Sequence, residues 1–194
     1  MKTILCIILL IFLGCTNPFD TREPSPPDVQ TPIQPISNLQ SNPDSLLKQL
    51  QYAFQEPNWN YYESVLVNPE DFPITFHFVP QQDAAYRLLD WSRDDELAYF
   101  RKLITDRQRN ELMLQIYNVK GPVQTGTSQD TLQVQFDYQI EINNQLYTEY
   151  YTGQSIFRIF RSSQSLWYIY YWEDFQTTAD DADSTWSILK ATYR

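Results

Sequence analysis

The stretch TLQVQFDYQIEI, residues 131–142, alternates between apolar and polar side chains without interruption. Apolar residues at every second position are typical of a β-strand with one buried face and one solvated face. The pattern therefore predicts a long strand in a sheet that is covered on one side. The side chains expected on the buried face are Leu132, Val134, Phe136, Tyr138, Ile140 and Ile142.

The residues that follow predict a hairpin. Asn143 and Asn144 tolerate the positive φ angles of a tight turn, and LYTEYYTGQSIFRIF, residues 146–160, reads as the returning strand. Gly153 lies in the middle of that strand. A glycine inside a strand often marks a bulge or bend, so we expect one near this position.

The register of this hairpin has two alternatives, and they place Glu149 on opposite faces. A two-residue loop would pair Ile142 with Gln145 and turn Glu149 toward the buried side, where it could serve as a general base. A three-residue loop would pair Ile142 with Leu146 and leave Glu149 in solvent. Because burial of an unpaired carboxylate costs several kcal/mol, we predict the three-residue loop, with Leu146 and Tyr150 facing inward.

The strand LWYIYYWEDF, residues 166–175, is apolar on both faces, so both faces need a cover. One cover would be a helical layer, and the other a second subunit or a terminal segment. Glu173 and Asp174 are neighbours on a strand and point in opposite directions, so we interpret them as structural or solvated rather than as a catalytic pair. Strict alternation places on one face Leu166, Tyr168, Tyr170 and Trp172.

The first half of the domain carries helix signals. Asn42, followed by proline, and Asn58 predict two helix starts, and Ser92–Asp95 predicts a capping box for a third helix. The stretch ITFHFV, residues 74–79, reads as a strand between the second and third helices. The end of the chain, residues 181–194, predicts a short capped helix or a closing turn.

Helices first and long strands afterwards predict an α+β fold for residues 44–194, with three N-terminal helices packed on a strongly curved antiparallel sheet. In this order of elements the chain resembles the nuclear transport factor 2-like (NTF2-like) superfamily, a cone fold that includes ketosteroid-isomerase-like and SnoaL-like proteins. The resemblance rests on SLLKQLQYAF (45–54), NWNYYESVL (58–66), the hairpin and WYIYYWEDF (167–175). It implies a cone-like domain. No catalytic motif of those isomerases is matched here.

The first residues, MKTILCIILLIFLGC, resemble a bacterial lipoprotein signal peptide. Lys2 is followed by the apolar run Ile4–Leu13, which is too short to span a bilayer. FLGC resembles a lipobox, which implies cleavage after residues 1–14 and acylation of Cys15, for example with palmitate. Thr16, in place of Asp, leads us to expect the outer membrane in a host with two membranes.

Residues 15–43 are rich in proline and poor in large apolar side chains. Such a segment cannot bury enough surface to fold, so we predict a lipid-anchored linker that holds the domain about 30 Å from the membrane. The expected location is the bacterial cell envelope, with the membrane as a partner through the lipid anchor.

The composition excludes several kinds of site. The formal charge of −10 argues against nucleic acid as a partner, because phosphate binding needs a basic patch. With two cysteines, both in the first 15 residues, and one histidine, we expect no disulfide and no metal site. Four glycines give no phosphate-binding loop, and we expect no cofactor. The acidic stretch Asp180–Asp183 lacks the spacing of a calcium-binding loop.

Two functions remain open from the sequence. The first is a non-catalytic, membrane-tethered domain that binds a small apolar ligand or a protein partner, and it could form a homodimer through the convex face of the sheet. The alternative is a small isomerase- or hydratase-type enzyme that uses a buried carboxylate or His77. We assign no catalytic residue. The candidates for lining a ligand pocket are Tyr62, Tyr138, Tyr150, Tyr168, Tyr170 and Trp172.

Overall fold

The structure is a computed structural model that describes residues 40–106, 111–126, 130–143, 146–177 and 184–194. The leader 1–14, Cys15, most of the linker 15–43 and the acidic residues Asp180–Asp183 lie outside the described residues. None of the helices within the described ranges is long and apolar enough to cross a membrane.

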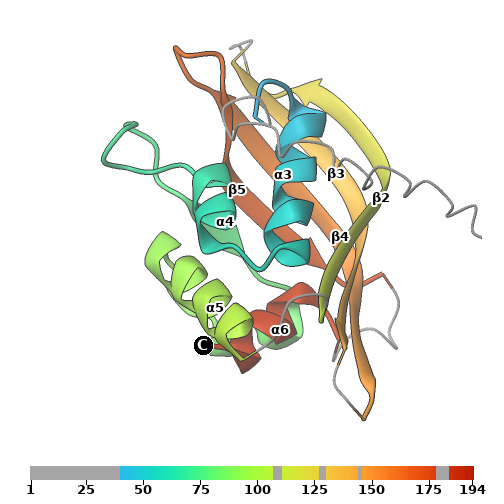
Figure 1. Cartoon of the computed structure of the whole chain (residues 1–194). Helices are drawn as coiled ribbons and strands as arrows, with labels where there is room; N and C mark the ends of the chain where they lie inside the picture. Colours follow the sequence, from blue (N-terminus) through green and yellow to red (C-terminus); the bar gives the residue numbers. More distant parts are fainter. Residues whose placement is uncertain (1–39, 107–110, 127–129, 144–145, 178–183) are drawn as a thin grey trace, which may run out of the picture. The chain divides into compact units, whose positions relative to one another are not determined.

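Helices and strands follow one another in the predicted order (Figure 1). The helical elements are α3 (Pro43–Gln55), α4 (Trp59–Val65), the 3-10 helix η2 (Gln82–Arg87), α5 (Arg93–Thr105) and α6 (Trp186–Thr192). The strands are β1 (His77–Val79), β2 (Leu112–Gln124), β3 (Thr131–Asn143), β4 (Thr148–Arg161) and β5 (Trp167–Phe175). The α+β fold class is confirmed.

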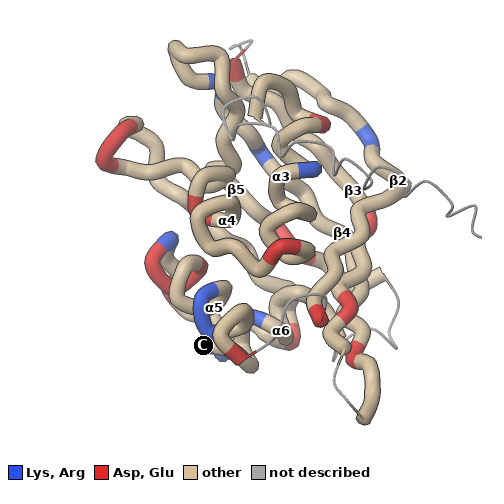
Figure 2. The backbone as a smooth tube through the Cα atoms, in the orientation of Figure 1, with Lys and Arg blue, Asp and Glu red and all other residues tan. Residues whose placement is uncertain are grey.

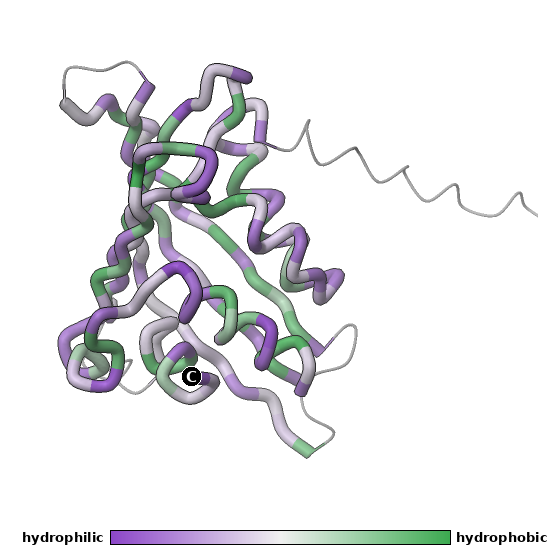
Figure 3. Tube along the Cα trace, turned by 90° about the vertical axis from the view of Figure 1, so that its left-hand side faces the viewer, coloured by the Kyte–Doolittle hydropathy of each residue, from purple (hydrophilic) through white to green (hydrophobic). Residues whose placement is uncertain are grey.

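The five strands form one sheet in the order β1-β5-β4-β3-β2. Pairing is antiparallel from β5 to β2, whereas the short β1 runs parallel to β5. The helices gather on one side of the curved sheet (Figure 1), and hydrophobic residues are spread along most helices and strands (Figure 3). The core is therefore shared between the two layers, and the other face of the sheet has no helical cover among the described residues.

The predicted helix starts are confirmed by their caps. The side chain of Asn42 accepts a hydrogen bond from the Ser45 backbone N–H, and the side chain of Asn58 caps α4. At α5, Ser92 and Asp95 form the reciprocal capping box. These side chains satisfy backbone N–H groups that have no partner within the helix, which fixes where each helix begins.

The predicted register of the β3–β4 hairpin is wrong. Ile142 pairs with Glu149 and Asn143 pairs with Thr148, so the loop comprises residues 144–147 and is longer than either alternative. Glu149 consequently lies on the helix-facing side, as the rejected two-residue loop would have placed it, and it is half-buried. Leu146 is 93% exposed, because the longer loop removes it from the strand.

The bulge expected at Gly153 is absent. Gly153 pairs in regular register with Tyr138, and the aromatic ring of Tyr138 lies over it. A Cβ atom at Gly153 would stand 2.4 Å from the Tyr138 hydroxyl oxygen and 2.6 Å from the Phe175 carbonyl oxygen. Close packing, rather than a bend, therefore explains the glycine.

In the β4–β5 pairing, the irregularity lies in β5 instead. Arg158 pairs with Tyr171 and Ile159 pairs with Ile169, so Tyr170 is an extra residue on the β5 side. Such a bulge changes which residues face the core. Trp167 and Ile169 before it, and Trp172 and Asp174 after it, are the buried residues of this strand. The predicted grouping of Tyr168 and Tyr170 with Trp172 is therefore wrong.

The residues just before α3 contact the start of β5. The backbone N–H of Trp167 donates to the carbonyl oxygen of Gln40 at 2.9 Å, and the Gln40 side-chain amide donates to the carbonyl oxygens of Ser64 and Trp167. Gln40 is only 3% exposed. Gln40 is therefore fixed to the start of β5.

Candidate functional site

The core contains two charged residues that lie on otherwise apolar helix faces. In α5, Glu96 shares a face with Tyr99, Phe100 and Leu103, and in α6, Lys190 shares a face with Trp186, Leu189 and Tyr193. Neither residue was predicted from the sequence. The spacing of these residues in the sequence could have indicated their burial, because in each helix the four positions follow the i, i+3, i+4, i+7 pattern of one buried face.

Glu96 is completely buried, and both of its carboxylate oxygens accept hydrogen bonds. Oε1 accepts from the Tyr62 hydroxyl, and Oε2 accepts from Trp91 Nε1 at 2.7 Å and from Lys190 Nζ at 2.8 Å. A buried carboxylate is tolerated when charge and hydrogen bonds compensate its lost hydration. Glu96 has both.

The ammonium group of Lys190 is completely buried between aromatic rings. Nζ lies 3.4 Å from the ring centroid of Trp172 and 3.6 Å from that of Phe78, within the range of cation–π attraction. Desolvation lowers the pKa of Lys190 from 10.5 to about 8, although the Glu96 carboxylate opposes this shift. We call Lys190 together with Glu96, Phe78 and Trp172 the lysine cage.

A second buried carboxylate, Asp174, ties β5 to α6. It accepts hydrogen bonds from the Tyr138 hydroxyl at 2.8 Å, from the Ser187 backbone N–H at 2.7 Å and from the Ser187 hydroxyl. Burial raises the pKa of Asp174, and these hydrogen bonds oppose the rise. The Tyr138 hydroxyl in turn accepts a hydrogen bond from the backbone N–H of Trp186 at 2.7 Å. The start of α6 is thereby fixed to the sheet.

Burial raises the pKa of the tyrosines around these carboxylates. The pKa values of Tyr62, Tyr99 and Tyr138 all lie well above the ordinary value, first because of desolvation and then because of the nearby carboxylates. At neutral pH these three hydroxyls remain protonated, so those of Tyr62 and Tyr138 can act as hydrogen-bond donors to Glu96 and Asp174.

The six pocket candidates do not come together. Tyr62, Tyr138 and Trp172 are fully buried in the core. Tyr150 is 52% exposed and pairs with Glu141 on the outer face. Tyr168 packs against Phe72 and Phe160, and the half-buried Tyr170 occupies the bulge.

His77 lies on β1 and is exposed, while Phe76 and Phe78 on either side of it are buried. Its ring faces that of Tyr171 at 5.7 Å on the outer side of the sheet. Glu173 is also on this side and accepts a hydrogen bond from the Tyr171 hydroxyl, whereas Asp174 is buried. The expectation that Glu173 and Asp174 point to opposite faces is confirmed.

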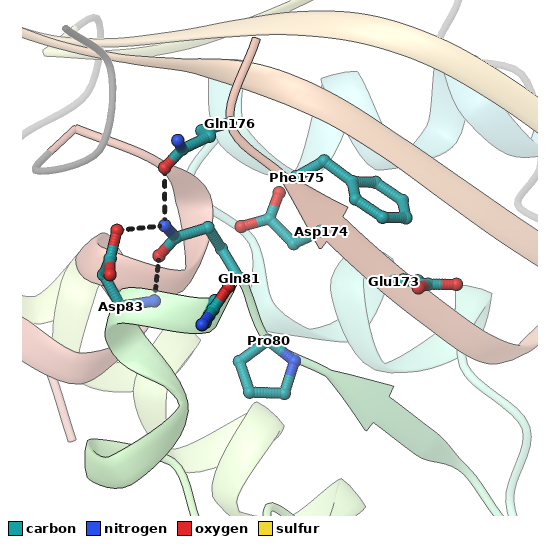
Figure 4. A pocket seen from close by; sticks show the side chains of 8 residues that line it. Pro80, Gln81, Asp83, Glu173, Asp174, Phe175 and Gln176 are labelled. Carbon is teal, nitrogen blue, oxygen red and sulfur yellow. Dashed lines mark hydrogen bonds between the residues drawn. The ribbon is translucent and has the colours of Figure 1, made fainter. Parts of the chain in front are cut away.

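The described residues form clefts at two margins of the domain. One, of about 390 Å³, is formed by the end of β5 and the start of η2 (Figure 4). Gln81 is central to its wall, since its amide donates to Asp83 and to Gln176. The other, of about 380 Å³, lies between α3 and the start of β2, and its lining residues are uncharged. Within the described ranges, no cluster of three or more acidic, histidine or cysteine side chains could hold a metal ion.

No protein-family model matches the sequence. No curated protein matches it either. Solved structures do match. A proposed dehydratase from the NTF2-like family of Streptomyces avermitilis is 12% identical, with a TM-score of 0.50 over 71% of this chain and 100% of that chain.

A proposed aromatic ring hydroxylase from Novosphingobium aromaticivorans is 11% identical, with a TM-score of 0.50 over 72% of this chain and 92% of that one. A variant of a Mycobacterium tuberculosis protein of unknown function is 8% identical, with a TM-score of 0.51 over 77% of this chain and 81% of that chain. At these identities the similarity concerns the fold alone. The chain has the NTF2-like fold that the sequence resemblance implied.

Proposed function

We propose that this chain is a membrane-tethered bacterial lipoprotein whose NTF2-like domain is a non-catalytic binding module that uses the outer face of its sheet. The observation that carries the proposal is the occupied interior. Glu96 and Lys190 are completely buried. Their hydrogen bonds go to the chain's own side chains. A general acid or base must instead reach a substrate.

The composition of the outer face supports a binding role. Aromatic and amide side chains share this face with Asp137, Glu141, Arg158 and Glu173. Aromatic enrichment is typical of protein interfaces. Lys and Arg are scattered over several elements in Figure 2 and form no basic patch on the sheet. One cross-strand row consists of Tyr117, Asp137, Gln154 and Phe175, and another of Met113, Glu141 and Tyr150.

We favour a second copy of this chain as the partner on this face. The same face of two copies can meet about a two-fold axis, and a stable interface needs only about 800 Å² from each partner. A dimer would also carry two lipid anchors. Because one acyl chain alone holds a protein weakly to a membrane, two linked anchors strengthen retention without any new contact.

The dimer is tested by substituting a tyrosine on the outer face. Tyr150→Glu is expected to raise the dimer dissociation constant at least about tenfold, because it places a charge next to Glu141 in the interface. Sedimentation equilibrium measures the constant. Tyr86→Glu is the matched control, since Tyr86 is 74% exposed on η2, away from the sheet. A monomeric parent chain, or equal effects of both substitutions, would contradict the proposal.

The anchor is tested at Cys15. Cys15→Ala is expected to abolish incorporation of labelled palmitate and to leave the leader uncleaved by the lipoprotein pathway, because the acylated residue is gone. Cys6→Ala is the control, since Cys6 lies in the leader and should not be needed for acylation. Labelling that persists in the Cys15 variant would refute the lipoprotein assignment.

A further inference from the structure

The lysine cage has the parts of an alkylammonium-binding site. Two ring faces, those of Trp172 and Phe78, stand within 3.6 Å of Lys190 Nζ. Glu96 supplies a charged hydrogen-bond acceptor at 2.8 Å, and Asp174 adds a second negative charge nearby. Aromatic faces combined with carboxylates are the means by which proteins recognise ammonium ligands.

The parts of the cage come from separate elements, and only the ammonium comes from α6. Phe78 belongs to β1, Glu96 to α5 and Trp172 to β5. β1 pairs with β5, and α5 packs on α4, which in turn packs on β5. The rest of the cage is therefore built by the sheet and α5, and α6 inserts the occupant.

The last turn of α6 is held by two side-chain hydrogen bonds, one part-buried and one exposed. Arg87 Nη2 donates to the Ala191 carbonyl oxygen at 3.1 Å, and Lys102 Nζ donates to that of Arg194 at 2.9 Å. The Lys102 bond is exposed to solvent, where such interactions are weak. Displacement of this end of α6 would withdraw Lys190 from the cage.

We propose that the lysine cage is a binding site for a primary alkylammonium ion, that Lys190 is its intramolecular occupant, and that α6 and a free alkylamine compete for it. This inference does not depend on the lipid anchor or on the dimer. The site takes primary alkylammonium ions, and in this structure Lys190 occupies it. The fitting ligand has a chain no longer than a lysine side chain.

The first experiment empties the cage by Lys190→Ala, which removes three methylene groups and the ammonium. We expect n-propylammonium to bind this variant saturably, with a dissociation constant on the order of 1 mM for so small a ligand. Binding of 1-propanol, which has the same length without the charge, should be at least about tenfold weaker. Titration calorimetry and ligand-dependent melting temperatures measure both. Equal binding of the two compounds would overturn the proposal.

Two further variants serve as controls. Lys190→Met keeps the cage filled by a chain of similar length, so it should not bind n-propylammonium. Adding Glu96→Gln to Lys190→Ala should remove the preference for the amine, because the charged acceptor is lost. Retention of the preference in that double variant would contradict the role assigned to Glu96.

The second experiment uses the unmodified chain, so it does not depend on the folding of any variant. A ligand at 100 times its dissociation constant shifts an opening equilibrium by about 100-fold. Saturating n-propylammonium should therefore accelerate amide hydrogen exchange in the last turn of α6, at residues 189–192, and leave exchange in β3 unchanged. Unaltered exchange in α6 would refute the competition, even if the emptied cage of the alanine variant binds the amine.

Discussion

Replacement of Glu96 by glutamine is expected to lower the free energy of unfolding by about 3–5 kcal/mol, although the two side chains have nearly the same shape. The substitution removes the negative charge 2.8 Å from Lys190 and leaves a completely buried ammonium without its partner. It also replaces an acceptor of the Trp91 and Lys190 bonds by an uncharged amide. Urea denaturation of the parent and the variant measures the difference.

The cause can be separated by a second substitution. Adding Lys190→Met to Glu96→Gln removes the uncompensated ammonium, so the double variant should recover much of the lost stability, and the two changes should be strongly non-additive. Glu63→Gln is the control. Its partner Arg93 lies 3.2 Å away, but the Glu63 side chain is 33% exposed, so the expected loss is below about 1 kcal/mol. Similar losses for Glu96→Gln and Glu63→Gln would show that the negative charge of Glu96 does not compensate the buried ammonium of Lys190.

The sequence was sufficient to predict those features of the structure that are determined by residues close together along the chain. Asn42, Asn58 and the Ser92–Asp95 box place three helix starts, because a cap is a contact between residues no more than four apart. The alternation of β3 is equally local, and its even-numbered residues Val134–Ile142 are indeed buried. The order of helices and strands then led to the NTF2-like fold.

Features set by contacts between distant residues could not be predicted in this way. The β3–β4 loop is two residues longer than the two-residue loop that Asn143 and Asn144 would form. A loop longer by two residues leaves every β4 side chain on the same face, so the pattern of alternation does not distinguish the two loops. The bulge at Tyr170 depends on the partner strand, since Arg158 pairs with Tyr171. The bulge cannot be recognised in the alternating aromatic pattern of β5.

The buried charges were missed for a different reason. The i, i+3, i+4, i+7 spacing around Glu96 and Lys190 is visible in the sequence, but a charged residue on an apolar helix face usually extends its charged end to solvent. Only the approach of α5 and α6 to each other places Glu96 against Lys190. A charge at a core position of one helix becomes informative when a second helix offers the opposite charge at an equivalent position.

Gly153→Ala is expected to be among the most damaging single-methyl additions in this chain, with a loss of about 3 kcal/mol or more. The added Cβ would lie 2.4 Å from the Tyr138 hydroxyl oxygen and 2.6 Å from the Phe175 carbonyl oxygen. Overpacking of this kind typically costs about 1–3 kcal/mol. The Phe175 oxygen belongs to the β5 backbone, so it cannot rotate away, and the Tyr138 ring must move instead.

Movement of the Tyr138 ring has a further cost, because its hydroxyl donates to Asp174 and accepts from the Trp186 N–H. Loss of these bonds leaves buried polar groups unsatisfied, at about 1–3 kcal/mol each. Gly126→Ala is the matched control. Gly126 has a φ of +73° but no atom within 4 Å of the added Cβ, so that variant reports backbone strain alone, about 1–2 kcal/mol. If urea denaturation finds Gly153→Ala no more destabilised than Gly126→Ala, Tyr138 does not lie over Gly153, and the hairpin register that pairs them is wrong.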